Sequence, residues 1–438
     1  LNRYYYMHEI KIIGAGLAGS EAALYLADKG WKVKLYEMRP MKMTPAHQTG
    51  YPAELVCSNS LKSTLLDTPA GLLKEELHLL GSKLLPVAES CAVSAGHSLA
   101  VDRNLFVQNI NDEIIHHANI EFIREEITTL PTELSILATG PLTSDNLIQE
   151  LQSVVGSAHL YFYDAIAPIV SADSLNMDKI YLKDRYDKGE PDYLNCPFTE
   201  EEYYHFVEAL LTGEKHPPHS FENEMTEAKL KFYENCIPIE ELARRGKDTL
   251  RFGVMRPIGL EKEGKTPFAV LQLRPENKEH TAYNLVGCQT MLRYSEQKRI
   301  FRLIPGLEKA EFLRYGSLHR NSYLNAPAVL NPELNLKNAP HIYVAGQLSG
   351  VEGYVECIAS GLLVAKIISE GLAMLPPETI TGQIWRRLID TSIKNFQPVN
   401  ANFGLLPALN NPLRDKKQKK LALSERSIKA LKDFLDNK

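Results

Sequence analysis

Two of the six cysteines lie in sequence contexts where a thiol could do chemistry. Cys236 stands just before Pro238 and a pair of glutamates, a pattern typical of the start of a helix. The positive end of the helix dipole would lower the pKa of that thiol and favour the nucleophilic thiolate. Cys57 is followed by Ser-Asn-Ser, whose polar groups can hydrogen-bond a thiolate, although an inert, partly buried thiol fits this pattern equally well.

Residues 8–39 predict a strand–turn–helix–strand unit that binds a dinucleotide. An apolar strand enters the turn GAGLAG, an Ala/Leu-rich helix follows, and the second strand ends on Glu37. Gly14 permits the tight turn, Gly16 lets the backbone approach a pyrophosphate, and Gly19 lets helix and strand pack closely. The helix N-terminus faces the phosphates, and Glu37 can accept hydrogen bonds from a ribose. Because all these parts occur in order, we predict dinucleotide binding.

The run from Pro40 to Thr68 has the proline and glycine content of a long loop. A loop of this length directly after the second strand of such a unit is typical of a segment that covers a ligand. It carries Cys57, so we expect this cysteine near the ligand.

Two later stretches return the chain to the dinucleotide. A short strand runs into Ala138-Thr139-Gly140, a turn that many flavoproteins place at the cofactor. The strand HIYVAG ends at Gly346 and is followed by Gly350, Gly353 and an apolar helix over 355–371. Glycines at a helix N-terminus leave backbone N–H groups free to face a flavin or its pyrophosphate. Together with the first unit, these turns favour FAD over NAD.

The order of these elements predicts an α/β fold with two domains. A discontinuous, Rossmann-like FAD-binding domain would comprise residues 1–170 and 319–438. A smaller α/β domain, richer in charge, Pro and Tyr, would be inserted over residues 171–318.

The bulk composition excludes several classes of protein. The chain has 438 residues, of which 44% are hydrophobic and 24% charged, and its formal net charge is −5, so the overall charge does not indicate a nucleic-acid partner. The scattered cysteines show no metal-binding or redox spacing, and we expect no metal and a reducing compartment. We expect no signal peptide and no membrane span, and therefore a cytoplasmic protein without an obligate protein partner.

Several blocks in order resemble one known family. They are GAGLAGSEAA, YEMRP, AELVCSNSLKS, the Cys236 segment with ARRGKDTLRFG, YNLVG, EQKRIFRLIPGLE, RYGSLHRN, AGQLSGVEGYVE and NANFGLLP. They resemble the bacterial folate- and FAD-dependent tRNA uracil-5 methyltransferases, the TrmFO family, from about His8 to Pro407.

The resemblance implies a reaction and roles for particular residues. In this family 5,10-methylenetetrahydrofolate supplies a carbon to C5 of uridine 54 in the tRNA T loop, and FAD reduced by NADH or NADPH completes the methyl group. Cys236 matches the cysteine that adds to uracil C6, and Cys57 matches the one beside the flavin. The family stacks the folate pterin on a histidine, for which His319 is the candidate, with Tyr354 packing on the same rings. Structural roles for His319 and Tyr354 stay open.

One block departs from the family pattern. The family commonly reads Phe-Gln-Thr-His after YNLVG, whereas this chain has Cys288-Gln289-Thr290-Met291. A related enzyme that methylates a uridine of 23S ribosomal RNA by the same chemistry is therefore an alternative. Another is a flavin-bearing RNA-binding protein without turnover.

Two clusters of basic residues leave their roles open. Arg244 and Arg245 would pair with phosphate or with the helix dipole, and the Lys/Arg cluster from Arg414 to Lys420 would be a solvated helix surface or an RNA contact.

Overall fold

The structure is a computed structural model. It describes residues 8–156, 159–185, 192–215, 237–262, 264–394, 396–411 and 413–437, with the backbone alone for 159–166 and 318–320.

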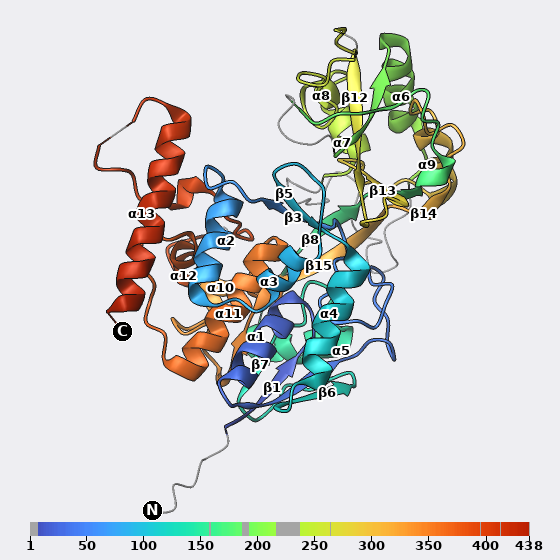
Figure 1. Cartoon of the computed structure of the whole chain (residues 1–438). Coiled ribbons are helices and arrows are strands. Elements are labelled where there is room, and N and C mark those ends of the chain that lie inside the picture. Colours follow the sequence, from blue (N-terminus) through green and yellow to red (C-terminus); the bar gives the residue numbers. More distant parts are fainter. Residues whose placement is uncertain are drawn as a thin grey trace, which may run out of the picture.

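A six-stranded sheet built from both ends of the chain organises the larger part of the molecule (Figure 1). Its strands, in spatial order, are β16 (Asn335–Leu336), β17 (Ala339–Val344), β7 (Ser135–Leu137), β1 (Glu9–Ile13), β2 (Lys32–Glu37) and β6 (Ile120–Arg124). All ladders from β17 to β6 are parallel. The predicted α/β class with a discontinuous Rossmann-like sheet is confirmed, because β17, from late in the chain, pairs with β7 and so joins the strands from its beginning, while β16 pairs with β17 at the edge.

Two helices that follow the glycine-rich turns pack against each other beside this sheet. They are α1 (Leu17–Asp28) and α11 (Tyr354–Glu370), and both are almost fully buried. Their backbones approach closely at Gly361, where an added Cβ would lie 2.2 Å from the carbonyl oxygen of Ala18. A glycine is therefore needed at this contact.

A second six-stranded sheet is antiparallel throughout and has its own apolar core. Its strands, in spatial order, are β10 (Tyr181–Leu182), β11 (Leu194–Phe198), β12 (Ala269–Pro275), β13 (Ala282–Leu285), β9 (Ile169–Ser171) and β14 (Phe312–Arg314). The helices that accompany it are α6 (Glu200–Thr212), α7 (Ile239–Arg244), α8 (Thr249–Phe252) and α9 (Tyr294–Phe301).

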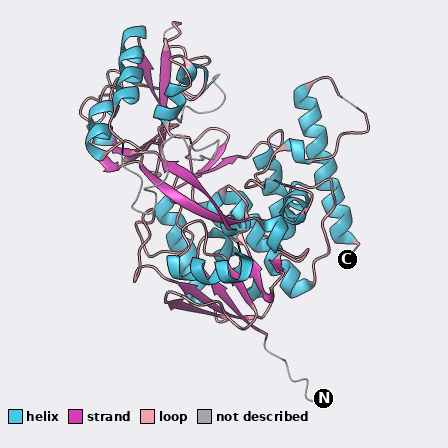
Figure 2. Cartoon of the chain, turned by 180° about the vertical axis from the view of Figure 1, so that it is seen from behind, coloured by secondary structure: helices cyan, strands magenta, loops and turns pink. Residues whose placement is uncertain are grey.

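The chain passes between the two sheets on a pair of long strands. These are β8 (His159–Ile166) and β15 (Ser317–Leu324), which pair antiparallel along their whole length and run from one part to the other in Figure 2. We keep 171–318 as the proposed extent of the inserted domain.

The stretch after β2 contains more regular structure than expected. The sequence predicts a loop to Thr68, but Ser60–Ser63 form β3, which pairs with β5 (Ser98–Val101), itself paired with β4 (Ala92–Val93). That part of the expectation is wrong, because pairing with residues almost forty positions later leaves no local signal.

The remaining helices cover the first sheet and the C-terminal side. They are α2 (Pro69–Leu80), α3 (Leu84–Ser90), α4 (Arg103–His116), α5 (Asp145–Val155), α10 (Ala326–Val329), α12 (Ile380–Ile389) and α13 (Lys416–Asp436). Buried Glu76 of α2 joins the last two, since its carboxylate accepts from the Ile380 and Thr381 amides (2.8 and 2.7 Å) and from the Ser427 hydroxyl (2.6 Å). Among the helices described, none is long and apolar enough to cross a membrane.

The α1–α11 contact gives a test of the packing. Alanine has a better helix propensity than glycine by about 1 kcal/mol, but the Gly361→Ala methyl would overlap a backbone carbonyl, and overpacking typically costs about 1–3 kcal/mol. We expect Gly361→Ala to lower the free energy of unfolding by about 1–2 kcal/mol, measured by denaturant titration. Gly16→Ala is the control, with all proteins compared free of FAD, since nothing lies within 4 Å of its added Cβ. An unchanged or more stable Gly361→Ala protein would contradict this packing.

Candidate active site

The glycines of the first turn divide into two kinds. Gly14 has φ +99°, and an added Cβ would lie 2.5 Å from the Ala138 carbonyl oxygen; at Gly19 it would lie 1.8 Å from that of Gly14. These two glycines are required by the protein's own packing. Beside Gly16 there is open space, as there is beside Gly140 at the end of the neighbouring strand β7. Because an added side chain at Gly16 would meet nothing, and α1 begins at the next residue, the start of this helix can accept a pyrophosphate.

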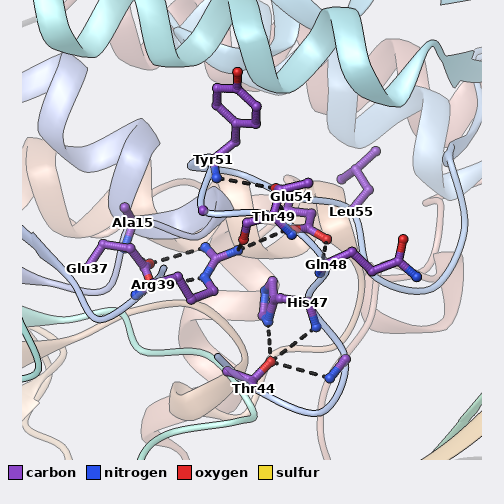
Figure 3. A network of polar contacts seen from close by, with 12 residues as sticks. Ala15, Glu37, Arg39, Thr44, His47, Gln48, Thr49, Tyr51, Glu54 and Leu55 are labelled. Atoms are coloured by element: carbon purple, nitrogen blue, oxygen red, sulfur yellow. Dashed lines mark hydrogen bonds and ion pairs between the residues drawn. The ribbon is translucent and has the colours of Figure 1, made fainter. Parts of the chain in front are cut away.

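Glu37 ends β2 and is tied to the same turn (Figure 3). Its Oε2 accepts a hydrogen bond from the Ala15 amide at 3.0 Å, and its Oε1 accepts from the Arg39 amide and Nε at 3.1 and 2.9 Å. Burial alone would raise the pKa of Glu37, but the Arg39 guanidinium and the backbone amides lower it, so the carboxylate stays charged. A ribose hydroxyl would therefore donate to a Glu37 oxygen that already accepts a hydrogen bond from Ala15 or Arg39.

Arg39 extends this contact into the loop that follows. It is 2% exposed, and its Nη1 donates to Glu54 at 3.1 Å and to the Thr49 carbonyl at 3.2 Å. Glu54 in turn accepts from the Gln48 and Thr49 amides at 2.8 and 3.0 Å. Figure 3 shows Arg39 between the two carboxylates, so residues 39–54 are fastened to the glycine-rich turn.

His47 lies within this loop as a neutral group. Its Nδ1 is 2.6 Å from the Thr44 hydroxyl. Burial, with the nearby Arg39, lowers the pKa of His47 to about 4, so the imidazole is uncharged at pH 7.

The glycines at the start of α11 serve internal contacts. An added Cβ would lie 3.0 Å from the Ala18 side chain at Gly346, 2.5 Å from Phe396 at Gly350 and 2.1 Å from Glu356 at Gly353. All three have positive φ, which disfavours other residues. Their glycine identity is therefore explained by packing, and their contact with a cofactor stays a prediction.

Cys57 is held in place by the first residue of α11. The Tyr354 hydroxyl accepts hydrogen bonds from the Cys57 amide at 2.8 Å and the Ser58 amide at 3.1 Å. Burial, followed by the nearby Cys57, raises the pKa of Tyr354, so the phenol stays protonated. Cys57 and Tyr354, both half-buried and both predicted site residues, thus lie side by side, and their contact with a ligand stays a prediction.

Arg103, at the start of α4, holds the other side of this segment. Its guanidinium donates to the carbonyls of Leu55 and Cys57, the latter at 3.2 Å, and pairs with Glu276 directly after β12. Burial would lower the pKa of Arg103, but the charge of Glu276 raises it above its ordinary value. Arg103 therefore places a fixed positive charge beside Cys57.

Asn59 and Arg274 complete the junction between the two sheets. The Asn59 amide donates to the Pro275 carbonyl at 2.9 Å, and its oxygen accepts from Arg274 Nε at 2.8 Å. Arg274 also donates to the Ser58 hydroxyl at 2.8 Å. The end of β12 is thereby bonded to the residues that follow Cys57.

Cys236 lies outside the described residues, but the helix predicted after it is confirmed. α7 begins at Ile239 with Pro238 as its N-cap. Buried Glu240 accepts from the Met291 amide at 2.6 Å and the Thr290 hydroxyl at 3.0 Å. The Met291 side chain, at the position of the sequence departure, is 4% exposed.

His319 lies in β15, where its backbone pairs with Asp164 of β8. The structure describes no side chain for His319, so its stacking role stays a prediction.

The other described cysteines are poor candidates for a nucleophile. Burial raises the pKa of the Cys196, Cys288 and Cys357 thiols, and Cys91 is fully buried. Within the described part of the chain, no group of three or more His, Cys, Asp or Glu side chains could hold a metal ion.

Comparison with known proteins assigns the chain to a family. The family model "Glucose inhibited division protein A" matches residues 9–374. The methylenetetrahydrofolate–tRNA-(uracil-5-)-methyltransferase TrmFO of Bacillus subtilis is 50% identical over 96% of this chain and 97% of its own length. The protein of the same name from Anoxybacillus flavithermus is 48% identical over 98% and 99%. The chain belongs to the TrmFO family.

Among solved structures, Aquifex aeolicus GidA has the same fold. The TM-score is 0.68 at 14% identity, over 98% of this chain and 74% of GidA. The TrmFO membership confirms the family resemblance found in the sequence.

Sequence reasoning missed four residues that hold the candidate site together, namely Arg39, Arg103, Arg274 and Glu276. Arg39 offered a signal as the arginine of YEMRP, and Arg103 as the residue after the helix-capping Asp102. Arg274 and Glu276, at the end of β12, offered no sequence signal, because their partners lie more than 170 positions away in the chain.

Glu240 gives a test of the α7 contact. Burial raises the pKa of Glu240 from 4.5 to about 7, so folding favours its protonated form. The stability that this proton provides is present below about pH 4.5 and lost as the pH rises through 7. We expect wild type to lose, over that window, on the order of 3 kcal/mol relative to Glu240→Gln, since one pKa unit corresponds to about 1.4 kcal/mol. Denaturant titration from pH 4.5 to 8 measures the free energy of unfolding of both proteins. The same pH dependence in wild type and Glu240→Gln would contradict a raised pKa of Glu240.

Proposed function

We propose that this chain methylates C5 of uridine in tRNA, with 5,10-methylenetetrahydrofolate as carbon donor and FAD as cofactor. The observation that carries this proposal is identity of 48–50% over nearly the whole length with proteins named as that methyltransferase. The geometry around Cys57 and the glycine-rich turn agrees with it. We further propose uridine 54 of the T arm as the target, NADH or NADPH as reductant, and a cytoplasmic location.

The residues of the first turn fit FAD. The open space beside Gly16 and Gly140 would admit the pyrophosphate, and the amides at the start of α1 would donate to it. Glu37 would hold the turn through Ala15 and contact the ribose. Reduced FAD, when bound, supplies the two electrons that convert the transferred carbon from methylene to methyl.

We propose different roles for the two cysteines, Cys236 as nucleophile and Cys57 beside the cofactor. We assign to Cys236 the addition of its thiolate to C6 of uracil, which makes C5 nucleophilic so that it bonds to the folate-derived carbon. The bond from that carbon to the folate nitrogen breaks, and tetrahydrofolate leaves. Loss of the C5 proton and expulsion of the thiolate then restore the ring. Cys57, held by Tyr354 and beside Arg103, would guard the cofactor or take up a proton.

His319 and Tyr354 are the proposed folate contacts. The Tyr354 hydroxyl accepts hydrogen bonds from the Cys57 and Ser58 amides. These bonds fix the position of the ring and involve only its hydroxyl, not the faces of the ring. The pterin would stack between the flavin ring and His319, and Tyr354 would pack on the same rings.

The experiment follows labelled carbon from methylenetetrahydrofolate, with NAD(P)H present, into unmodified tRNA and separately into ribosomal RNA. We expect label in 5-methyluridine at tRNA position 54 with wild type, loss of label with Cys236→Ala, and retained FAD absorbance in both. Cys91→Ala is the matched control, because Cys91 is fully buried and bonded to Asn109 at 3.3 Å.

Each other outcome selects an alternative. Label in ribosomal RNA alone would assign the activity to the ribosomal alternative raised by the Met291 departure. No label from FAD-loaded protein that still binds RNA would favour the non-catalytic alternative. Full activity of Cys236→Ala would overturn the role of that cysteine.

A further inference from the structure

A row of aromatic rings runs from the core of the second sheet to the surface. Phe301 lies 6.5 Å from Phe312, between ring centroids. Phe312 stacks on Tyr315 at 5.2 Å with 11° between the planes, and Tyr315 stacks on Tyr294 at 4.9 Å and 25°. Phe301 is fully buried, whereas Tyr294 is 52% exposed. The row therefore presents a rigidly backed ring to solvent.

Two residues of the row adjoin parts of the molecule described above. Tyr315 follows Arg314. Burial and the charge of Arg103 lower the pKa of Arg314, and Tyr354 and Cys57 oppose this effect, so Arg314 lies near the Cys57 segment. Tyr294 lies directly after the loop that Glu240 fastens to α7, the helix following Cys236. Figure 1 shows α9 and β14 side by side at the edge of the second sheet that leads into β15.

Cations accompany the exposed ring. Lys298 is exposed and four residues after Tyr294 on α9, hence on the same helix face. Arg293, just before Tyr294, is 49% exposed and paired with Glu214 at 2.8 Å. An exposed ring with nearby cations suits an unpaired nucleobase and its phosphate, because bases stack on aromatic side chains and phosphates bind Lys and Arg.

We propose that the exposed ring of Tyr294, backed by Tyr315 and Phe312, is a stacking platform for an unpaired base of the RNA substrate, with Lys298 on its phosphate. The inference rests on the proposed function, since it requires an RNA substrate. It goes further by assigning one surface and one kind of contact, a base outside the reacting uridine.

Tyr294→Ala tests the platform and Tyr294→Phe retains the ring. With FAD-loaded protein and unmodified tRNA, we expect Tyr294→Ala to raise the Kd about tenfold or more, the loss typical of one stacked base, and Tyr294→Phe to leave it within about twofold. KM for tRNA should rise with Kd while kcat stays near wild type. Phe252→Ala is the matched control, since Phe252 is 75% exposed in the same domain but outside the row.

The outcomes separate the two proposals. Wild-type protein that binds and methylates tRNA, with Tyr294→Ala equal to it in Kd, would overturn the platform and leave the proposed function standing. Equal losses in Tyr294→Ala and Phe252→Ala would also overturn it, because the effect would not depend on the row. Wild-type protein that binds no RNA would overturn both proposals. Circular dichroism and FAD content of each variant distinguish lost stacking from lost folding.

Discussion

The arrangement of the site depends on one largely buried charge, that of Arg103. Arg103 lies between the residues before β3 and the end of β12, and its guanidinium bonds two carbonyls of the Cys57 segment and the carboxylate of Glu276. A buried guanidinium is tolerated when its charge is paired and its donors are satisfied, and removal of one partner typically costs about 3–5 kcal/mol. The pair therefore fixes how the second sheet meets the first, and it does so at the cysteine.

Around this charge, the glycines and carboxylates of the first sheet separate structural from ligand-facing roles. Gly14, Gly19 and Gly361 allow backbones to approach within the protein, whereas the space beside Gly16 stays open. Glu37 serves the protein as well, through the Ala15 amide and Arg39. A dinucleotide-binding pattern in a sequence thus contains residues that build the turn and residues that face the ligand, and the structure tells them apart.

The sequence predicts the parts of this molecule that are encoded locally. Strand β1, helix α1 and strand β2 follow from the spacing of apolar residues and glycines within thirty positions, and the start of α7 follows from Pro238 and the acidic residues after it. The return of the chain at β17 is also predicted, because its strand and glycines repeat the first pattern. Such signals need no knowledge of distant residues.

The contacts that complete the site are not local. Tyr354 and Cys57 are separated by 297 residues and Arg103 and Glu276 by 173, so no periodicity connects them. The β3–β5 pairing was missed for the same reason. From residue types alone, Cys57 is equally compatible with an inert thiol. Only folding brings Tyr354 and Arg103 next to it.

Hydrogen exchange of Glu276→Gln tests most directly whether the Arg103 pair positions the Cys57 segment. We expect the amides of Cys57 and Ser58 to exchange faster than in wild type, because Arg103 loses its charged partner, while exchange in β1 and β2 is unchanged. Glu308→Gln, which removes an exposed pair with Lys179 (2.7 Å), is the matched control and should exchange like wild type at Cys57. Unchanged protection of Cys57 and Ser58 in Glu276→Gln would contradict the account.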